Sequence, residues 1–242
     1  MDSAFTNKVA VVTGASSGIG RAIALRLTAE GATVCIVGRR MRALRDVGKE
    51  SGRGSLIHAF RVDLTNDHDI RTLVSSLQND FAHIDILVHS AAIITFGSLA
   101  HASLNDLDLE FRTNLRAPYA LTQALLPSLQ RSCGQIVFIN STNGLKARAT
   151  VGQYSAMKHG LKAMADSLRD EVNAEGIRVV SMFLGRTATP MQATIFHDEH
   201  RIYRPELLLN PNDVATMLVS VLSLPPTAEV MEIVMRPAIK SY

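Results

Sequence analysis

The stretch KVAVVTGASSGIG, residues 8–20, joins an apolar run to a glycine-rich turn. The run over residues 8–13 is short, continuous and rich in valine, which is typical of a strand buried on both faces of a parallel sheet. Residues 21–30 continue as a helix that ends at Gly31, where a left-handed backbone conformation is easily taken. A turn between a strand and a helix N-terminus presents backbone N–H groups to an anion, as in pyrophosphate-binding sites.

The glycines of this turn have the spacing G-x-x-x-G-x-G, which differs from the generic G-x-G-x-x-G fingerprint. A tight turn without a ligand is therefore an alternative interpretation. If the turn binds a pyrophosphate, the residues that do so are Gly14, Ser16, Ser17, Gly18, Ile19 and Gly20.

Strand and helix patterns alternate along the rest of the chain. We expect further strands over residues 32–37, 56–62, 84–88, 135–141, 177–183 and 230–235, and helices over residues 41–49, 69–81, 104–129 (with a bend near Pro118), 154–174 and 211–222. Such alternation predicts parallel βαβ units with helices on both faces of a doubly wound, seven-stranded sheet. Neither a linker nor a repeat interrupts residues 1–242, so a single α/β domain is expected.

The composition is that of a globular protein with a sizeable core. Of the 242 residues, 47% are hydrophobic and 19% charged. The formal net charge of +3 is too small to indicate a nucleic-acid-binding protein. Cys35 and Cys133 show no metal-ligand spacing, which favours reduced thiols in a cytoplasmic protein. Residues 1–7 lack the features of a leader peptide, and no apolar run is long enough to span a membrane.

The second expected strand ends at a pair of arginines, Arg39 and Arg40. In dinucleotide sites an acid at this place binds the adenosine ribose, whereas an arginine binds a 2′-phosphate. The pattern thus favours NADP(H) over NAD(H), although solvated arginines at a helix start are the alternative. Asp63, which ends the third strand, is suited to an adenine amino group.

Tyr154 and Lys158 are four residues apart in a helical pattern, so they lie one turn apart on the same face. A nearby ammonium lowers the pKa of a phenol, which prepares it for proton transfer near neutral pH. The pair alone fits an ordinary helix face equally well, with Lys158 reaching to water. Ser141, at the end of the preceding strand, adds a hydroxyl group to the same region.

These motifs together resemble the short-chain dehydrogenase/reductase family over essentially the full length of the chain. The matching motifs are residues 13–20, Asp63-Leu64, Asn114, Ser141 and residues 154–158, and Ser141 precedes Tyr154 by the thirteen residues usual in the family. Residues 186–192 and 232–237 are similar to the short, NADP-dependent, single-domain members, some of which oxidise hydroxy acids or reduce small ketones.

The resemblance implies a Rossmann-like fold and a role for each matching residue. Tyr154 exchanges the carbonyl proton, Ser141 hydrogen-bonds the substrate oxygen, and Lys158 lowers the pKa of Tyr154 and binds the nicotinamide ribose. Asn114 holds a proton-relaying water, unless it is a helix asparagine bonded to a neighbouring carbonyl. The implied cofactor-binding residues beyond the glycine turn are Arg39, Arg40, Asp63, Leu64, Ser90, Ala91, Ala92, Tyr154, Lys158, Gly185, Thr187 and Thr189.

Two positions depart from the family pattern. The usual Asn-Asn-Ala-Gly after the fourth strand is His89-Ser90-Ala91-Ala92 here, so the Ser90 hydroxyl stands in place of the amide that normally braces the sheet, and a less rigid local structure is expected. Leu184 stands where a proline usually precedes Gly185.

The substrate side is expected to comprise Ser141, Asn143, Tyr154 and Arg186, with residues 93–96, 143–151 and 184–209 lining or covering it. The aperiodic segment 184–209 is interpreted as a mobile lid. Arg186, Lys146 and Arg148 are candidates for an anionic substrate, with exposed loop charge as the alternative. His197 and His200 lack a third ligand, so no metal site is expected.

The leading hypothesis is an NADP(H)-dependent enzyme that transfers hydride between the nicotinamide and a small carbonyl compound or secondary alcohol. Two alternatives stay open: a 3-oxoacyl-carrier-protein-type reductase, which requires a basic patch beside the pocket, and a cofactor-sensing regulatory protein without turnover. As in family tetramers, the helices over residues 105–129 and 154–174 are expected to form the faces of a homo-oligomer, either a tetramer or a dimer.

Overall fold

Seven short apolar runs form the strands of one parallel sheet in the computed structural model, which describes residues 3–239. The strands are β1 (Val9–Thr13), β2 (Thr33–Gly38), β3 (Ile57–Arg61), β4 (Ile86–His89), β5 (Gln135–Ser141), β6 (Arg178–Leu184) and β7 (Glu232–Met235). Their order in the sheet is β3-β2-β1-β4-β5-β6-β7, and every pairing is parallel. The predicted doubly wound α/β fold is confirmed.

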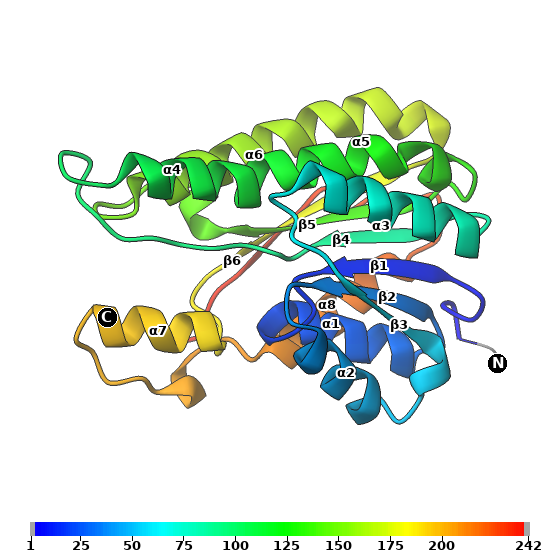
Figure 1. The fold of residues 1–242 in the computed structure, drawn as a ribbon, viewed down its shortest axis with the longest axis horizontal. Coiled ribbons are helices and arrows are strands. Elements are labelled where there is room, and N and C mark those ends of the chain that lie inside the picture. Colours follow the sequence, from blue (N-terminus) through cyan, green and yellow to red (C-terminus); the bar gives the residue numbers. More distant parts are fainter. Residues whose placement is uncertain (1–2, 240–242) are drawn as a thin grey trace.

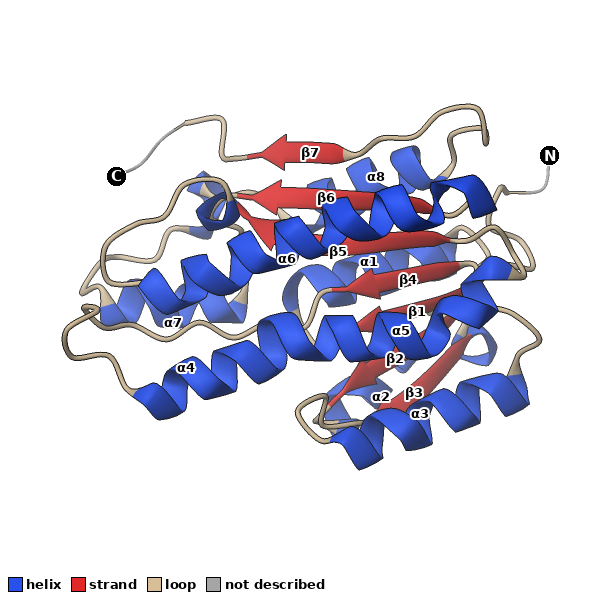
Figure 2. Ribbon diagram, turned by 90° about the horizontal axis from the view of Figure 1, so that it is seen from above, coloured by secondary structure: helices blue, strands red, loops and turns tan. Residues whose placement is uncertain are grey.

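Helices cover both faces of this sheet (Figure 1). One face carries α1 (Gly18–Ala29), α2 (Met41–Glu50) and α8 (Pro211–Leu222), and the other carries α3 (Asp67–Asp80), α5 (Ala117–Gln130) and α6 (Gly152–Val172). Two further helices, α4 (Leu104–Phe111) and α7 (Pro190–Asp198), lie toward the end to which the strands point (Figure 2). Short 3₁₀ turns occupy Gly54–Leu56, Thr142–Gly144, Asn173–Glu175 and Pro205–Leu207.

The core consists of two hydrophobic clusters, one on each face of the sheet. In β1, Ala10 and Val12 belong to the cluster under α1 and α8, whereas Val11 belongs to the cluster under α3, α5 and α6. All three side chains are fully buried. This explains the continuous apolar composition of the strand, because a strand covered on both faces has no polar side.

The order of the strands reverses at β1, which pairs with β2 on one side and with β4 on the other. At such a reversal the loops after the two strands leave toward opposite faces and open a crevice at their carboxyl ends. The glycine turn follows β1 and residues 90–97 follow β4, so both segments border this crevice.

The segment over residues 104–130 differs from the single bent helix that the sequence predicts. The helix is continuous, but Arg112–Arg116 forms a π-helical turn between α4 and α5. The irregularity thus lies one turn before the predicted bend at Pro118. A proline has no N–H to donate to the carbonyl four residues earlier, here that of Asn114, and a π turn is one way in which a helix accommodates this.

The segment 184–209 is more regular than the predicted aperiodic lid, because it contains α7. The helix begins with Thr189 as its N-cap, whose hydroxyl accepts a hydrogen bond from the Gln192 N–H at 3.1 Å. Pro190 follows as the first helical residue. The sequence therefore held a start signal that a search for apolar periodicity misses.

Candidate active site

A cavity of about 1090 Å³ lies at the carboxyl ends of the strands. It extends from the glycine turn and the end of β2 to the ends of β5 and β6, and α7 forms part of its wall. Every predicted site residue except Asn114 and Lys146 lines it: Gly14, Ser16, Ser17, Gly18, Ile19, Gly20, Arg39, Arg40, Asp63, Leu64, Ser90, Ala91, Ala92, Ser141, Asn143, Arg148, Tyr154, Lys158, Gly185, Arg186, Thr187 and Thr189.

The glycine turn is held so closely that its glycines admit no side chain. Gly14 has a φ of +66°, and a Cβ there would lie 2.8 Å from the backbone of Ala91. A Cβ at Gly20 would lie 2.6 Å from the carbonyl oxygen of Gly14. The glycines thus allow the turn to pack closely on itself and on the loop after β4, and this cradle at the N-terminus of α1 fits a pyrophosphate.

The brace between β1 and β4 comes from Thr13 rather than from Ser90. The Thr13 hydroxyl donates to the carbonyl of Val88 at 3.3 Å and accepts from the N–H groups of Ser90 and Ala91 at 3.0 and 3.2 Å. Within residues 3–239 the Ser90 hydroxyl makes no corresponding bond, and Thr13 alone supplies these three hydrogen bonds. Sequence reasoning missed Thr13 because its role depends on a strand 75 residues away.

The end of β2 places two exposed guanidinium groups at the cavity. Arg40 donates to the Ser16 hydroxyl at 3.5 Å, which draws it toward the glycine turn. Arg39 lies near Asp63 and helps to lower the pKa of that carboxyl, although the main cause is the pair of hydrogen bonds from Thr65. Two arginines beside the phosphate cradle, with no acid at the end of β2, fit a further phosphate group.

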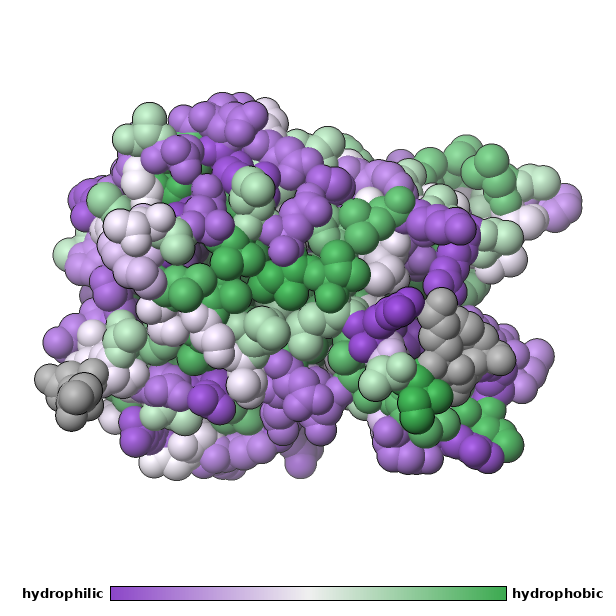
Figure 3. Space-filling model, turned by 180° about the vertical axis from the view of Figure 1, so that it is seen from behind, coloured by the Kyte–Doolittle hydropathy of each residue, from purple (hydrophilic) through white to green (hydrophobic). Residues whose placement is uncertain are grey.

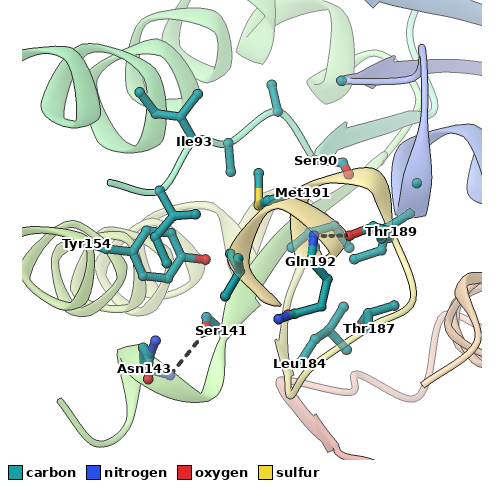
Figure 4. A pocket seen from close by; sticks show the side chains of 18 of the residues that line it. Ser90, Ile93, Ser141, Asn143, Tyr154, Leu184, Thr187, Thr189, Met191 and Gln192 are labelled. Carbon is teal, nitrogen blue, oxygen red and sulfur yellow. Dashed lines mark hydrogen bonds between the residues drawn. The ribbon is translucent and has the colours of Figure 1, made fainter. Parts of the chain in front are cut away.

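Ser141 ends β5 and points into the cavity opposite Tyr154 (Figure 4). Its oxygen accepts a hydrogen bond from the Asn143 N–H at 3.1 Å. A hydroxyl that accepts in this way still has its own hydrogen to donate. The arrangement therefore leaves Ser141 ready to donate to an oxygen beside Tyr154.

Tyr154 and Lys158 lie on the buried face of α6, as their spacing predicts. Their relative exposures are 8% and 3%. The Lys158 Nζ lies 5.7 Å from the centre of the Tyr154 ring and donates to the carbonyl of Ile139 at 2.9 Å.

The predicted lowering of the Tyr154 pKa is not found in the chain by itself. Burial raises the pKa of Tyr154 to about 12, an effect that the Ser141 hydroxyl opposes. Burial likewise lowers the pKa of Lys158 to about 8. Desolvation sets the direction of both shifts, and Lys158 donates to a backbone carbonyl rather than to the phenol.

Asn114 lies in the π turn and does not line the cavity. Its side chain accepts from the Ile93 N–H at 2.9 Å and donates to the Ile93 carbonyl at 2.8 Å. The alternative of a bond to a carbonyl of its own helix is therefore not what the structure contains, because the partner carbonyl is that of Ile93 in the loop after β4. Asn114 instead ties the helix to the loop after β4.

Sequence reasoning also missed Asn140, which fixes the end of β5 against α6. Its side chain donates to the Lys158 carbonyl at 3.2 Å and accepts from the Ser141 N–H at 2.7 Å. A Cβ at Gly144 would lie 2.7 Å from the Asn140 Oδ1, so this glycine permits the close approach. Asn140 therefore sets the position of Ser141 relative to Lys158.

Arg186 is paired within the segment that covers the cavity. Its Nη2 donates to both carboxyl oxygens of Glu199 at 2.7 and 2.9 Å, and its guanidinium stacks on Phe196 at 4.8 Å. Its buried Nη1 has no hydrogen-bond partner among residues 3–239, and the same holds for the Nε2 of Gln192. The charge that the sequence offers to an anionic substrate is thus largely balanced by Glu199.

The sequence profile described as short chain dehydrogenase matches residues 8–200. The chain belongs to the short chain dehydrogenase family. An oxidoreductase of uncharacterised activity from Staphylococcus epidermidis is 31% identical over 232 residues, covering 95% of this chain and 97% of its own length. The closed form of a serine dehydrogenase complexed with NADP+ is 27% identical with a TM-score of 0.87, covering 97% and 96% of the two chains. An actinorhodin polyketide ketoreductase with NADPH is 28% identical with a TM-score of 0.86, covering 94% and 95%.

None of the helices between residues 3 and 239 has the length and apolar character needed to cross a membrane. Within the same range, no group of three or more His, Cys, Asp or Glu side chains is arranged to hold a metal ion.

Proposed function

We propose that this short chain dehydrogenase transfers hydride between NADP(H) and a small carbonyl compound or secondary alcohol. The observation that carries the proposal is that one cavity joins the glycine turn and two arginines to the Ser141 and Tyr154 hydroxyls. Similar chains of known structure hold NADP+ or NADPH, which supports the choice of cofactor.

The residues divide into a cofactor side and a reaction side. The backbone of the glycine turn binds the pyrophosphate, Arg39 and Arg40 bind the 2′-phosphate, and Asp63 accepts a hydrogen bond from the adenine amino group. Gly185, Thr187 and Thr189 hold the nicotinamide end, where bound NADPH supplies the hydride. The fit rests on the close packing of the turn and on the two cationic groups beside it.

On the reaction side, Tyr154 donates a proton to the carbonyl oxygen during reduction and accepts one during oxidation. Ser141 donates a hydrogen bond to the same oxygen and stabilises charge that develops on it. Lys158 supplies positive charge behind the phenol and binds ribose hydroxyls. Asn114 holds the proton-relaying water through its backbone, since both polar groups of its side chain bond Ile93.

The substrate side of the cavity combines apolar residues, among them Ile93, Ile94, Phe96, Val151 and Met191, with polar ones such as Asn143 and Gln192. We infer a small substrate with an apolar portion. Arg186 can contact an acceptor group of the substrate through Nη1 only if the side chain moves, because that atom is buried. Ser141 and Asn143 complete the predicted substrate-binding set.

A reductase of carrier-bound 3-oxoacyl groups is the second candidate, and the similarity to a polyketide ketoreductase favours it. The basic patch that this alternative requires is weakened by Glu199, which pairs with Arg186 and also with Arg201 at 3.4 Å. Turnover of acyl thioesters faster than of simple ketones would select this candidate. A homo-oligomeric state and a cytoplasmic location stay predictions.

The proposal is tested with a panel of ketones, aldehydes, hydroxy acids and acyl thioesters, each followed by nicotinamide absorbance with NADPH or NADP+. Tyr154→Phe removes the hydroxyl and keeps the ring, so kcat is expected to fall by at least about a hundredfold, the usual contribution of a general acid. NADPH affinity, measured by fluorescence, should stay within about twofold of the wild type because the contacts to the pyrophosphate and the 2′-phosphate are unchanged. Substantial turnover by this variant would remove Tyr154 from its role.

A further inference from the structure

Glu110 is a carboxyl group buried where an apolar residue would be less costly. It lies in α4 with 0% relative exposure. Its Oε1 accepts from the Thr95 N–H at 2.6 Å and from the Thr95 hydroxyl at 2.9 Å, while the buried Oε2 has no hydrogen-bond partner in the described part of the chain. Burial raises the pKa of this carboxyl. A half-satisfied buried acid destabilises a fold, so its presence calls for another explanation.

Thr95 connects Glu110 to the helix that carries the catalytic tyrosine. The Thr95 hydroxyl donates to Glu110 and accepts from the Gln153 Nε2 at 2.8 Å. Gln153 directly precedes Tyr154 in α6 and is itself 5% exposed. One hydroxyl therefore links α4, the loop after β4 and the start of α6.

The helix that contains Glu110 is hydrogen-bonded to the loop after β4 at a second place, one turn after Glu110. Asn114 follows Glu110 by four residues and binds both backbone groups of Ile93, whereas Glu110 binds Thr95. The far end of the loop is held by the Gly97 N–H, which donates to the Thr150 carbonyl at 2.9 Å. Residues 93–97 are thus fixed between α4 and the segment that leads into α6.

This loop forms one wall of the substrate side of the cavity. Ile93, Ile94 and Phe96 line the cavity, and Figure 4 shows Ile93 on the same side of the pocket as Tyr154. A charge on Glu110 would add to the burial that raises the pKa of Tyr154 and would oppose the burial that lowers the pKa of Lys158. A displacement of Thr95 would therefore move the substrate wall and the start of α6 together.

We propose that Glu110, Thr95 and Gln153 form a positioning cluster that sets the substrate wall of residues 93–96 against Tyr154. The inference rests on the proposed function for its kinetic part. None of its three members lines the cavity, so the cluster acts through the loop and through the position of Tyr154. None of its members was singled out by the sequence motifs, because the cluster joins three segments that are distant in the chain.

Thr95→Val tests the cluster directly, since it keeps the size of the side chain and removes the bridging hydroxyl. We expect kcat/KM for the best carbonyl substrate to fall by about tenfold or more, because small displacements of reacting groups have such effects. Part of the loss should appear in kcat, while NADPH affinity stays within about twofold. Thr95→Ser restores the hydroxyl and should recover most of the activity. Thr28→Val removes a buried hydroxyl bonded to the Ala24 carbonyl in α1 and serves as the control for loss of a buried threonine hydroxyl.

Wild-type kcat/KM in Thr95→Val, or an equal loss in Thr95→Ser, would overturn the proposal. So would a fall in NADPH affinity and thermal stability that accounts for the whole kinetic loss, because that pattern describes a general structural role. Amide hydrogen exchange gives a readout that needs no turnover. The backbone amides of residues 95 and 97 should lose protection against hydrogen exchange by about tenfold or more in Thr95→Val and in Glu110→Leu. Unchanged protection in both variants refutes the cluster, whereas changed protection in a chain that reduces no carbonyl refutes the proposed function alone.

Discussion

Single residues at the site owe their properties to neighbours that are distant in the sequence. Tyr154 was identified by its spacing to Lys158 and Ser141, and the structure brings all three to one cavity. The direction of its pKa shift was predicted wrongly, because burial and the orientation of Lys158 toward Ile139 cannot be derived from a spacing. The ion pair between Arg186 and Glu199 could not be predicted either, because it depends on where α7 places Glu199 relative to the end of β6.

Arg39 offers a prediction at the scale of one side chain. If Arg39 binds the 2′-phosphate, the wild type binds NADPH more tightly than NADH, and Arg39→Asp reverses this order. A lost charge-assisted hydrogen bond costs about 1.5–3 kcal/mol, which corresponds to roughly a 10- to 100-fold loss of NADPH affinity. Dissociation constants for both nucleotides, measured by nicotinamide fluorescence, give the answer.

The matched control for this change is Arg42→Asp. Arg42 is exposed on α2 and does not line the cavity, yet its replacement alters the net charge by the same amount. Cofactor preference should survive Arg42→Asp. An unchanged preference in Arg39→Asp would show that the end of β2 does not bind the 2′-phosphate.

Elements were predicted well where their apolar pattern is regular and poorly where the site shapes them. The seven strands and the helices along both faces were identified, with bounds that differ by a few residues. The π turn over Arg112–Arg116 was not predicted, since one extra residue in a helical turn leaves the apolar pattern almost unchanged. The helix α7 was missed because its short length gives little periodicity, although Thr189-Pro190 marks its start.

The turn between β1 and α1 provides a prediction at the scale of an element. Gly20→Ala places a Cβ 2.6 Å from the Gly14 carbonyl oxygen, so the turn must shift. NADPH affinity is expected to fall by at least about tenfold, and the free energy of unfolding by about 1–3 kcal/mol, the usual cost of overpacking. Fluorescence titration and chemical denaturation measure the two effects.

Gly152→Ala is the control for this substitution. Gly152 begins α6, and no atom lies within 4 Å of a Cβ at this position. Since alanine favours a helix more than glycine does, stability should be kept or slightly raised. Normal NADPH binding by Gly20→Ala would mean that the close contact with Gly14 does not shape the phosphate cradle.

At the scale of the whole molecule, the sequence predicts the layers but not the order in which the strands meet. The alternation of strands and helices requires a parallel sheet between helices, and this is what Figures 1 and 2 show. The order follows from long-range contacts such as the Thr13 brace between β1 and β4. Figure 3 shows the face that carries the β7 edge, where apolar side chains gather and the molecule is hollowed beside α7.

Acid stability is a property of the whole fold to which one buried residue contributes. His89 is 4% exposed, stacks on Phe138 and bonds the Thr122 hydroxyl at 2.8 Å, and burial lowers the pKa of its imidazole from 6.5 to about 3. Below pH 6.5 the unfolded chain binds a proton that the folded chain does not. The free energy of unfolding should therefore fall with decreasing pH between 6.5 and about 3, by up to about 1.4 kcal/mol for each pH unit.

Chemical denaturation over this pH range measures the effect. His89→Asn keeps a hydrogen-bond donor near Thr122 and removes the titrating group, so its stability should fall less steeply with acid. Equal slopes for the variant and the wild type would show that His89 takes up its proton without unfolding.

The central claim is that the glycine turn and the Ser141–Tyr154 pair serve one bound dinucleotide. The most direct test is a crystal structure of the chain with NADP+. The account predicts the pyrophosphate on the turn at Gly14–Gly20, the 2′-phosphate at Arg39 and Arg40, and the nicotinamide ring beside the Tyr154 and Ser141 hydroxyls. A nicotinamide ring bound away from Tyr154, or a Tyr154 hydroxyl turned out of the cavity, would contradict it.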